Sequence, residues 1–340
     1  MIEELVIGLD IGGTNTLIGL VDKYANVLGK IELKTQDYTS AQMFVDAICQ
    51  KIFSLIQQHP NSIVRGIGVG VPNGNYHRGT VEFAPNLPWK GVVPLADMIR
   101  EKIEYLFKEN LENIGQHQKN NIHRLQSQGF PVLLTNDANA AAIGEMVYGH
   151  AVNIRDFIYI TLGTGLGCGI VVNGRLVYGH DGFAGELGHV IMIPNGRLCG
   201  CGNQGCLETY CSSTGVKRTY IELHQKNHLP LPVSEQEITS LYVYQRALDN
   251  DPLALETFDF TAEILGLAMA NSVKYTSPEA IFLFGGLSFS GDLLLKPTIK
   301  HFEKNLLPIH KNKIKILFSG LNEGNVAILG AGSLIWKMKN

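Results

Sequence analysis

The sequence predicts an α/β fold with two duplicated domains, each built around a mixed sheet. The main observation is a repeat of strand, glycine turn, strand, tight turn and strand, which spans residues 5–34 and recurs at residues 157–178. Helix and strand patterns mix along the rest of the chain, as they do in α/β proteins. A chain of 340 residues is also long enough for two cores. We expect a smaller domain of residues 1–134 with the C-terminal helix at 323–340, and a larger domain of residues 135–322.

The first copy of the repeat has strands at residues 5–10, 17–21 and 27–34. The turn between the first two strands contains Gly12, Gly13, Thr14 and Asn15. A Gly-Gly pair between two apolar runs favours a hairpin, because glycine tolerates positive φ. The same turn exposes backbone N–H groups that can hold a phosphate.

Asp10 ends the first strand, where an open α/β sheet binds its ligands. A carboxylate beside a bound phosphate requires a cation between them, which implies Mg²⁺. The alternative is an aspartate that starts the turn by bonding its own backbone. The presence of a second glycine turn favours the first interpretation.

A helix and a glycine-rich strand follow the first copy. Apolar residues with a helical period predict a helix at 41–57. A strand is predicted at 64–71, with Gly66, Gly68 and Gly70 on one face. Such a face indicates that another element packs close to the strand backbone.

The next part of the chain is less regular. Residues 72–89 are rich in Asn and Pro and predict a loop with a hairpin, and residues 95–114 predict a long amphipathic helix. The polar stretch at 115–129 predicts a surface excursion with little core. A short strand at 131–135 then leads into an alanine-rich helix that ends near Met146.

Asn136 and Asp137 lie between that strand and that helix. Either side chain could cap the helix N-terminus, since its oxygen can accept a backbone N–H. The other interpretation makes Asp137 a general base, which accepts the proton of a hydroxyl as the oxygen attacks a phosphoryl group. Taken alone, this pair of residues favours neither interpretation.

The second copy of the repeat has strands at residues 157–162, 168–172 and 175–178. A tight Asn-Gly turn at residues 173–174 joins the last two strands. Its glycine turn contains Gly163, Thr164 and Gly165. Two such turns in matching positions predict two hairpins that contact phosphates.

The chain becomes helical after residue 208. Helices are predicted at 214–226, 234–248 and 252–275, strands at 281–284 and 314–318, and a closing helix at 325–337. The first of these strands leads into Gly285 and Gly286. This pair is either a plain turn into a helix or a place where a nucleotide base lies flat against the backbone.

The segment from residue 185 to residue 208 is rich in glycine. It contains the ligand set of a closed tetrahedral zinc site in His189, Cys199, Cys201 and Cys206. Such a site stabilises a loop. Disulfides would leave one of the three thiols unpaired, and a chance cluster of buried thiols does not explain the interleaved glycines.

Glu186 and Glu208 flank these metal ligands. Zinc would fix both carboxylates relative to His189, whose second ring nitrogen remains available for a hydrogen bond. Rigidly placed polar groups of this kind suit a polyhydroxylated ligand such as a sugar. A solvated surface carboxylate is the simpler explanation for either glutamate alone.

Composition argues against several classes of partner. The formal net charge is −3 and there is no basic arm, so nothing favours binding to nucleic acid or to an anionic membrane. The acidic N-terminus enters a strand at once and no apolar run reaches the length of a membrane span, which predicts a cytoplasmic protein without a signal peptide. Cys49, Cys168 and Cys211 are then expected to be core thiols.

Together these motifs resemble the ROK family of sugar kinases and repressors, within the actin, hexokinase and Hsp70 superfamily. DIGGTN at Asp10 is similar to the first phosphate motif of that family, LGTGLG at Leu162 to the second, and FGGL at Phe284 to the adenosine motif. NDANAA at Asn136 resembles the catalytic segment. The residues from Glu186 onward resemble the family signature E-x-G-H followed by C-x-C-G-x-x-G-C-x-E.

The resemblance implies a two-domain actin-like ATPase fold, related to ribonuclease H, with an interdomain cleft. It implies ATP-dependent phosphorylation of the 6-hydroxyl of a hexose, with Asp137 as general base and with structural zinc. Sugar contacts would come from Asn86, Asn136, Asp137, Glu186, His189 and Glu208. MgATP would contact Asp10, Gly12, Gly13, Thr14, Asn15, Gly163, Thr164, Gly165, Gly285 and Gly286.

Glucose is the first expected substrate. N-acetylglucosamine, N-acetylmannosamine and mannose are the alternatives, because discrimination at the C2 position depends on a few contacts. Family members commonly have Pro-Gly where this chain has Pro72-Asn73, so that loop could shape the pocket differently. Because family members are usually dimers or tetramers, we expect a homodimer or a homotetramer.

A sugar-responsive repressor is the main alternative from another class. Repressors of this family carry an N-terminal winged-helix segment, and here the first strand starts near residue 5, which leaves no room for one. An Hsp70-like ATPase or an actin-like filament protein would lack the metal segment. Neither glycine turn has the G-x-G-x-x-G pattern of a dinucleotide-dependent oxidoreductase.

Overall fold

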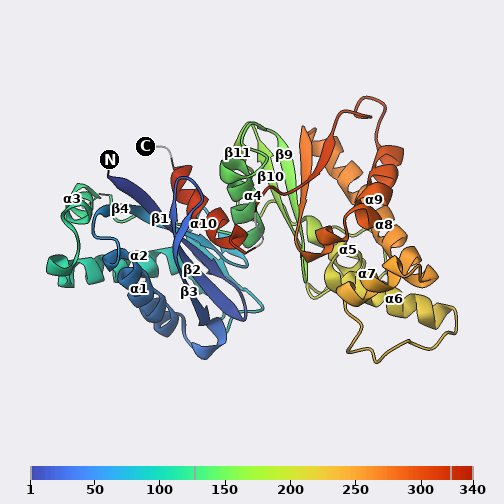
Figure 1. Ribbon diagram of the computed structural model, residues 1–340, viewed down its shortest axis with the longest axis horizontal. Helices are drawn as coiled ribbons and strands as arrows, with labels where there is room; N and C mark the ends of the chain where they lie inside the picture. Colours follow the sequence, from blue (N-terminus) through green and yellow to red (C-terminus); the bar gives the residue numbers. More distant parts are fainter. Residues whose placement is uncertain (1, 126–127, 322–323, 339–340) are drawn as a thin grey trace. The chain divides into compact units, whose positions relative to one another are not determined.

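A computed structural model describes residues 2–125, 128–321 and 324–338 of the chain (Figure 1). The chain forms two compact units. The first comprises Met1–Asn153, Tyr178–Ala184 and Gly320–Asn340, and the second comprises Ile154–Val177 and Gly185–Ser319. The division after residue 153 differs from the predicted boundary at residue 134, because the helix that begins at Asp137 packs in the first unit. Residues 322–323 and 339–340 of the expected C-terminal segment lie outside the described part of the chain.

The first unit contains a five-stranded sheet in the order β3-β2-β1-β4-β8. Strand β1 pairs antiparallel with β2 and parallel with β4, and β4 pairs parallel with β8. This register puts Asp10, near the end of β1, opposite Leu17 of β2 and Gly70 of β4. The strands are β1 (Glu3–Ile11), β2 (Asn15–Asp22), β3 (Val27–Lys34), β4 (Ser62–Gly70) and β8 (Val132–Thr135).

Helices cover both faces of this sheet. The apolar residues of α1 (Ala41–Gln57) and α2 (Leu95–Glu109) share a core with Leu5, Ile7 and Leu9 of β1. Because side chains alternate along a strand, the residues between Leu5, Ile7 and Leu9 face the opposite side of the sheet. On that opposite side, α10 (Val326–Trp336) packs against β1 and β4 (Figure 1).

Glycines let α10 approach the sheet backbone. A Cβ at Gly8 would overlap the carbonyl oxygen of Ile328, and a Cβ at Gly68 would overlap that of Ala331. Helix α4 (Asp137–Tyr148) packs on α10 in the same way, since a Cβ at Gly144 would lie 2.9 Å from Gly330 Cα. The close packing expected at the glycine-rich strand is confirmed.

The segment predicted at residues 115–129 as a surface excursion with little core is more ordered than expected, and its residues 126–127 lie outside the described part of the chain. Helix α3 (Gln116–Leu125) is present there and packs on β4. Its Gln118 side chain accepts from the Val64 N–H at 2.8 Å, and its Asn121 side chain donates to the Val64 carbonyl at 3.2 Å. Both amides are buried, so polar residues here make core contacts. The preceding helix α2 is also shorter than predicted, and a 3₁₀ turn, η2 (Leu111–Asn113), follows it.

A small sheet of β5 (Gly74–Asn75), β6 (Thr80–Glu82) and β7 (Val92–Val93) completes the first unit. Asn75 is fully buried and donates to the Asp181 carbonyl at 2.7 Å. The rings of Tyr76 and Tyr178 stack with their centres 4.0 Å apart. These contacts explain why residues 178–184 belong to the first unit.

The second unit repeats the strand order of the first. Its sheet has the order β11-β10-β9-β12-β13, in which the third, second, first, fourth and fifth strands follow one another as they do in the first sheet. The strands are β9 (Phe157–Leu162), β10 (Leu166–Val172), β11 (Arg175–Leu176), β12 (Ala280–Phe284) and β13 (Lys315–Phe318). The predicted α/β class with duplicated mixed sheets is confirmed.

Helices pack on one face of the second sheet and share its core. They are α5 (Glu208–Cys211), α6 (Ser213–Lys226), α7 (Ser240–Leu248), α8 (Pro252–Thr276) and α9 (Asp292–Asn305). Helix α7 starts later than predicted because Thr239 caps it, accepting from the Tyr242 N–H at 3.0 Å. Helix α9 is absent from the predicted elements and contains Pro297, a residue that normally disfavours a helix interior. Among the described helices, none is long and apolar enough to span a membrane.

Candidate functional site

The first glycine turn lies at the end of β1, beside Asn86. The Gly12 N–H donates to the Asn15 carbonyl at 2.9 Å and closes the turn, and the Thr14 carbonyl accepts from Thr35 at 2.8 Å. A Cβ at Gly13 would lie 2.8 Å from the Asn86 carbonyl oxygen and 2.9 Å from the Asn86 Cβ. Glycine at this position therefore brings the turn into contact with Asn86.

Asp10 and Asp137 both approach Gly70 of β4. A Cβ at Gly70 would lie 3.8 Å from Asp10 Oδ1 and 3.7 Å from Asp137 Cα. Burial, and to a smaller extent the negative charge of Asp137, raises the pKa of Asp10 to about 7. Asp10, with Asp137 beside it, offers carboxylate oxygens next to the first glycine turn, and such oxygens are the ligands that Mg²⁺ prefers.

Asn136 caps α4, and Asp137 is the first residue of that helix. The Ala138 N–H is shared, since it donates to Asn136 Oδ1 at 2.9 Å and to Asp137 Oδ1 at 2.7 Å. Burial by the surrounding protein raises the pKa of Asp137, and the Ala138 N–H opposes this effect. The residue as a whole is nevertheless exposed.

The second glycine turn connects β9 and β10 in the second unit. The Gly163 N–H donates to the Gly165 carbonyl at 3.0 Å. The start of α6 holds the turn from outside, because the Ser213 N–H donates to the Gly163 carbonyl at 2.8 Å and Thr214 Oγ1 donates to the Thr164 carbonyl at 3.0 Å. The turn is therefore fixed by one internal hydrogen bond and by two from the start of α6.

Gly285 packs directly against this part of the second unit. It follows β12 with φ 101°, and a Cβ there would lie 2.7 Å from the Leu162 carbonyl oxygen. By contrast, a Cβ at Gly286 would meet nothing within 4 Å. Gly286 thus presents bare backbone to open space at the start of the 3₁₀ turn η4 (Gly286–Ser290).

Glu208 joins the second turn to the segment that carries the cysteines. Its Oε2 accepts from the Leu166 N–H at 2.9 Å, and a Cβ at Gly165 would overlap that oxygen. Its Oε1 lies 3.8 Å from Cys199 Sγ. The Glu208 carboxylate therefore contacts both the second glycine turn and Cys199.

The four predicted metal ligands converge in one place. The ligand atoms of His189, Cys199, Cys201 and Cys206 all lie within 4.8 Å of one another. Cys199 Sγ is 3.7 Å from His189 Nδ1, and Cys201 Sγ is 3.7 Å from Cys206 Sγ. Tetrahedral zinc with ordinary Zn–S and Zn–N bonds holds neighbouring ligand atoms roughly 3.5–3.8 Å apart. The spacing and the donor types fit zinc, and we call residues 189–206 the metal loop.

The two nitrogens of His189 face different groups. Nδ1 points to Cys199, while Nε2 lies 3.9 Å from Glu186 Oε2. His189 ends the 3₁₀ turn η3 (Leu187–His189), which directly follows Glu186. One nitrogen is thus directed to the metal ligands, and the other remains on the side of Glu186.

The loop that contains Pro72 and Asn73 has a regular local structure. Asn73 has φ 53°, a left-handed conformation that asparagine tolerates better than most residues. Its side chain donates to the Glu82 carbonyl at 3.0 Å, which fastens the loop to β6. The Asn73 side chain is therefore used in a local hydrogen bond.

The candidate residues form one group in each unit. The first unit brings together Asp10, Gly12, Gly13, Thr14, Asn15, Asn86, Asn136 and Asp137. The second brings together Gly163, Thr164, Gly165, Glu186, His189, Cys199, Cys201, Cys206, Glu208, Gly285 and Gly286. Two contacts are additional to the predicted set: Gly70 next to both aspartates, and the Leu166 N–H on Glu208. Of these two contacts, only the one at Gly70 was indicated by the sequence, through the close packing expected at the glycine-rich strand.

A model of the ROK family matches residues 6–112 and 110–338, which is nearly the whole chain. The chain belongs to the ROK family. Similar ROK proteins include a glucokinase of Halalkalibacterium halodurans, which is 32% identical over 100% of this chain and 97% of its own length. A xylose repressor of Caldicellulosiruptor bescii is 29% identical over 97% of this chain and 77% of its own length.

A solved ROK structure has the same fold. The ROK family glucokinase of Streptomyces griseus, in complex with glucose and AMPPNP, is 32% identical to this chain. It superposes with a TM-score of 0.73 and covers 97% of this chain and 98% of its own. The family's two-sheet, actin-like architecture is therefore also that of this protein.

Proposed function

We propose that this ROK protein is an ATP-dependent hexose kinase that phosphorylates the 6-hydroxyl of its substrate, with glucose as the preferred sugar. The main support is the position of Asp137, an exposed residue at the start of α4, next to Asp10 and the first glycine turn. The relatives support the same class of reaction. One is named glucokinase, and the similar solved structure is a glucokinase in complex with glucose and AMPPNP.

In the proposed reaction Asp137 accepts the proton of the 6-hydroxyl as the sugar oxygen attacks the γ-phosphorus of ATP. The bond from that phosphorus to the β–γ bridging oxygen breaks, and ADP leaves. The raised pKa of Asp137 suits this role, because a base transfers protons best when its pKa approaches the working pH. The protein otherwise contributes alignment and charge stabilisation, which is most of what phosphoryl transfer requires.

The nucleotide is proposed to bind the two glycine turns. Backbone N–H groups of residues 12–15 and 163–165, with the hydroxyls of Thr14 and Thr164, would hold its phosphates. The backbone at Gly285 and Gly286, which faces open space at Gly286, would offer a surface for the base. Asp10 would hold Mg²⁺ directly or through water, and the ion would neutralise charge on the phosphate oxygens.

The proposed sugar contacts are the polar side chains of Asn86, Asn136, Asp137, Glu186, His189 and Glu208. Zinc on the metal loop would have a structural role, because four protein ligands leave it no open position. With Nδ1 of His189 on the metal, Nε2 is left for a sugar hydroxyl. N-acetylglucosamine and N-acetylmannosamine remain the alternative substrates.

The proposal is tested by ADP release from purified protein with MgATP and a panel of sugars. The panel is glucose, mannose, N-acetylglucosamine and N-acetylmannosamine, with the Asp137→Asn variant, purified identically, as the measure of contaminating kinases. We expect the highest kcat/KM with glucose and a product phosphorylated at the 6-position, as read by NMR. Release of ADP at the level of the variant with every sugar would reject kinase function.

A further inference from the structure

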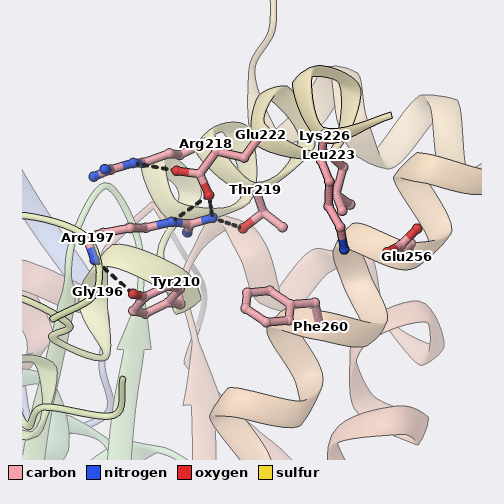
Figure 2. A pocket seen from close by; sticks show the side chains of 10 residues that line it. All are labelled: Gly196, Arg197, Tyr210, Arg218, Thr219, Glu222, Leu223, Lys226, Glu256 and Phe260. Atoms are coloured by element: carbon pink, nitrogen blue, oxygen red, sulfur yellow. Dashed lines mark hydrogen bonds and ion pairs between the residues drawn. The ribbon is translucent and has the colours of Figure 1, made fainter. Parts of the chain in front are cut away.

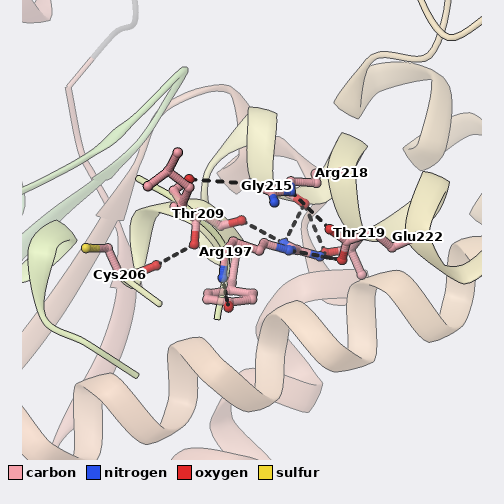
Figure 3. A network of polar contacts seen from close by, with 9 residues as sticks. Arg197, Cys206, Thr209, Gly215, Arg218, Thr219 and Glu222 are labelled. Atoms are coloured by element: carbon pink, nitrogen blue, oxygen red, sulfur yellow. Dashed lines mark hydrogen bonds and ion pairs between the residues drawn. The ribbon is translucent and has the colours of Figure 1, made fainter. Parts of the chain in front are cut away.

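Arg197 lies within the metal loop and is almost completely buried, with 7% of its surface exposed. Its Nε and Nη2 donate to one Glu222 oxygen at 3.1 and 2.6 Å, and Nη2 also donates to Thr219 at 2.9 Å (Figure 3). Its Nη1 donates to the Thr209 and Gly215 carbonyls at 2.6 and 3.3 Å. Every nitrogen of the guanidinium therefore has a partner, as a buried arginine requires.

The backbone of Arg197 connects the two sides of the metal loop. Its carbonyl accepts from the Gly205 N–H at 2.8 Å, one residue before Cys206. Its N–H donates to the Tyr210 hydroxyl at 2.9 Å, and the guanidinium lies 4.5 Å from the centre of the Tyr210 ring (Figure 2). Since Cys199 follows two residues later, Arg197 is bonded close to two of the four proposed metal ligands.

The partners of Arg197 also lie next to a proposed sugar contact. Thr209 and Tyr210 belong to α5, the short helix that begins at Glu208. Thr219 and Glu222 belong to α6, which is a longer helix packed in the core of the second unit. The side chain of Arg197 therefore holds the metal loop and the residues after Glu208 onto a rigid helix, through contacts that involve no metal.

A pocket of about 520 Å³ borders this network and exposes its outer side. Lys226, Glu256 and Phe260 line it together with Arg197 and Glu222 (Figure 2). Its charges are of both signs and indicate no particular ligand. The pocket does show that Glu222 is reachable from solvent. Its ion pair with buried Arg197 therefore has a smaller desolvation penalty than a fully enclosed ion pair has.

Arg218 offers a matched comparison. It donates to the other Glu222 oxygen at 3.0 Å, so both arginines bind the same carboxylate. Its side chain is 46% exposed, and it donates a 3.4 Å hydrogen bond to the Leu198 carbonyl of the metal loop. Loss of Arg218 removes an exposed ion pair, which contributes little. Loss of Arg197 removes the buried contacts that order the loop.

We propose that Arg197 is a positioning residue that orders the metal loop and Glu208 before zinc binds. A loop already held in its bound conformation loses less freedom when the metal arrives, so it holds the metal more tightly. The part of this proposal that concerns sugar binding rests on the proposed kinase function, whereas the part that concerns zinc does not.

The test compares Arg197→Met, Arg197→Lys and Arg218→Met with the unmodified chain. The first readout is zinc release to a chromogenic chelator. We expect release to be about 10- to 100-fold faster in Arg197→Met, the usual effect of losing a group that supports metal ligands. Arg197→Lys should be intermediate, because one ammonium replaces only some of the donors. Arg218→Met should release zinc at the unmodified rate.

The second readout is steady-state kinetics with glucose. Arg197→Met should raise KM by roughly 10-fold with kcat within about twofold, because it misplaces binding groups and leaves Asp137 in place. Equal zinc release from Arg197→Met and Arg218→Met would overturn the proposal. If Arg197→Met does not fold, Arg197→Lys decides between the outcomes. Absence of turnover in every protein, with the expected order of zinc release, would reject the kinase function and leave the role of Arg197 in the loop supported.

Discussion

The Glu208 carboxylate accepts a hydrogen bond from the Leu166 backbone N–H at 2.9 Å, which joins the end of the metal loop to the second glycine turn. Its other oxygen lies 3.8 Å from Cys199 Sγ. One side chain thus contacts a proposed metal ligand and a proposed phosphate-binding turn. Changes at Glu208 should therefore affect both substrates.

Replacement of Glu208 by alanine should raise KM for ATP as well as for glucose, because the Leu166 N–H loses its acceptor. Replacement by glutamine keeps an oxygen for that N–H and should raise KM for glucose alone. We expect increases of about 10-fold or more, the usual effect of losing a hydrogen bond to a charged group. Kinetics with each substrate varied in turn will check this. An unchanged KM for ATP in Glu208→Ala would argue against the link.

Asp137→Asn should lower kcat by about 10²- to 10⁴-fold, the range for loss of a general base. Its amide oxygen can still accept from the Ala138 N–H, so the start of α4 should keep its structure. Glucose binding by calorimetry should therefore change by less than about threefold, since a single weak hydrogen bond is at stake. A variant with normal kcat would remove Asp137 from the role of base.

Asp10→Asn should stabilise the magnesium-free protein more as the pH rises from about 4 to about 7. The pKa of Asp10 is raised from 3.8 to about 7 in the folded protein, so the folded state binds this proton more tightly than the unfolded state does. The unmodified protein therefore has the stability that comes from protonated Asp10 at low pH, and it loses that stability as the pH rises from about 4 to about 7. Asparagine stays neutral and escapes the loss.

Thermal unfolding of both proteins between pH 4 and pH 8 checks this prediction. Addition of Mg²⁺ should reduce the difference in melting temperature between the two proteins at high pH, because a cation favours the charged carboxylate. A difference in melting temperature between the two proteins that shrinks with rising pH in the absence of Mg²⁺ would contradict the predicted direction of the effect.

The purified protein should contain one zinc ion per chain, as measured by elemental analysis. Cys201→Ser should lose the metal and raise KM for glucose, because the positions of His189 and Glu208 then depend on protein contacts alone. Cys49→Ala is the control, since Cys49 is buried in the core of the first unit. Full zinc content in Cys201→Ser would contradict the assignment of the metal loop.

Gly8→Ala should destabilise the first unit, because the new Cβ would overlap the Ile328 carbonyl oxygen. Overpacking of this kind typically costs about 1–3 kcal/mol, and here the obstacle is backbone, which yields less than a side chain. Gly286→Ala should leave stability nearly unchanged, since a Cβ there meets nothing within 4 Å. Urea unfolding of the two variants provides the comparison, and equal midpoints would exclude tight packing at Gly8.

Elements with strong local signals could be predicted from the sequence. The apolar period of residues 41–57 gave helix α1 with its observed bounds. The two glycine turns gave the duplication, because each sits between two apolar strands. The His-Cys spacing gave the four groups that now lie within 4.8 Å of one another. In each case the residues that determine the structure are neighbours in sequence.

Features that depend on distant partners could not be predicted. Gln118 and Asn121 look like solvated residues until Val64 provides an N–H and a carbonyl for them. Arg197 resembles any loop arginine, because the Glu222 and Thr219 that neutralise and bind it lie more than 20 residues away. The same holds for Glu208, whose partner Leu166 is 42 positions earlier. Composition and periodicity carry no information about such pairs.

The packing of α10 on β1 has a consequence for biosynthesis. The strand is made first and its covering helix, residues 326–336, more than 300 residues later, with the whole second unit encoded between them. The second unit can thus complete its core while the first still exposes the glycine face of its sheet. During translation, the amino-terminal half of this protein should depend on chaperones for longer than the half that follows it.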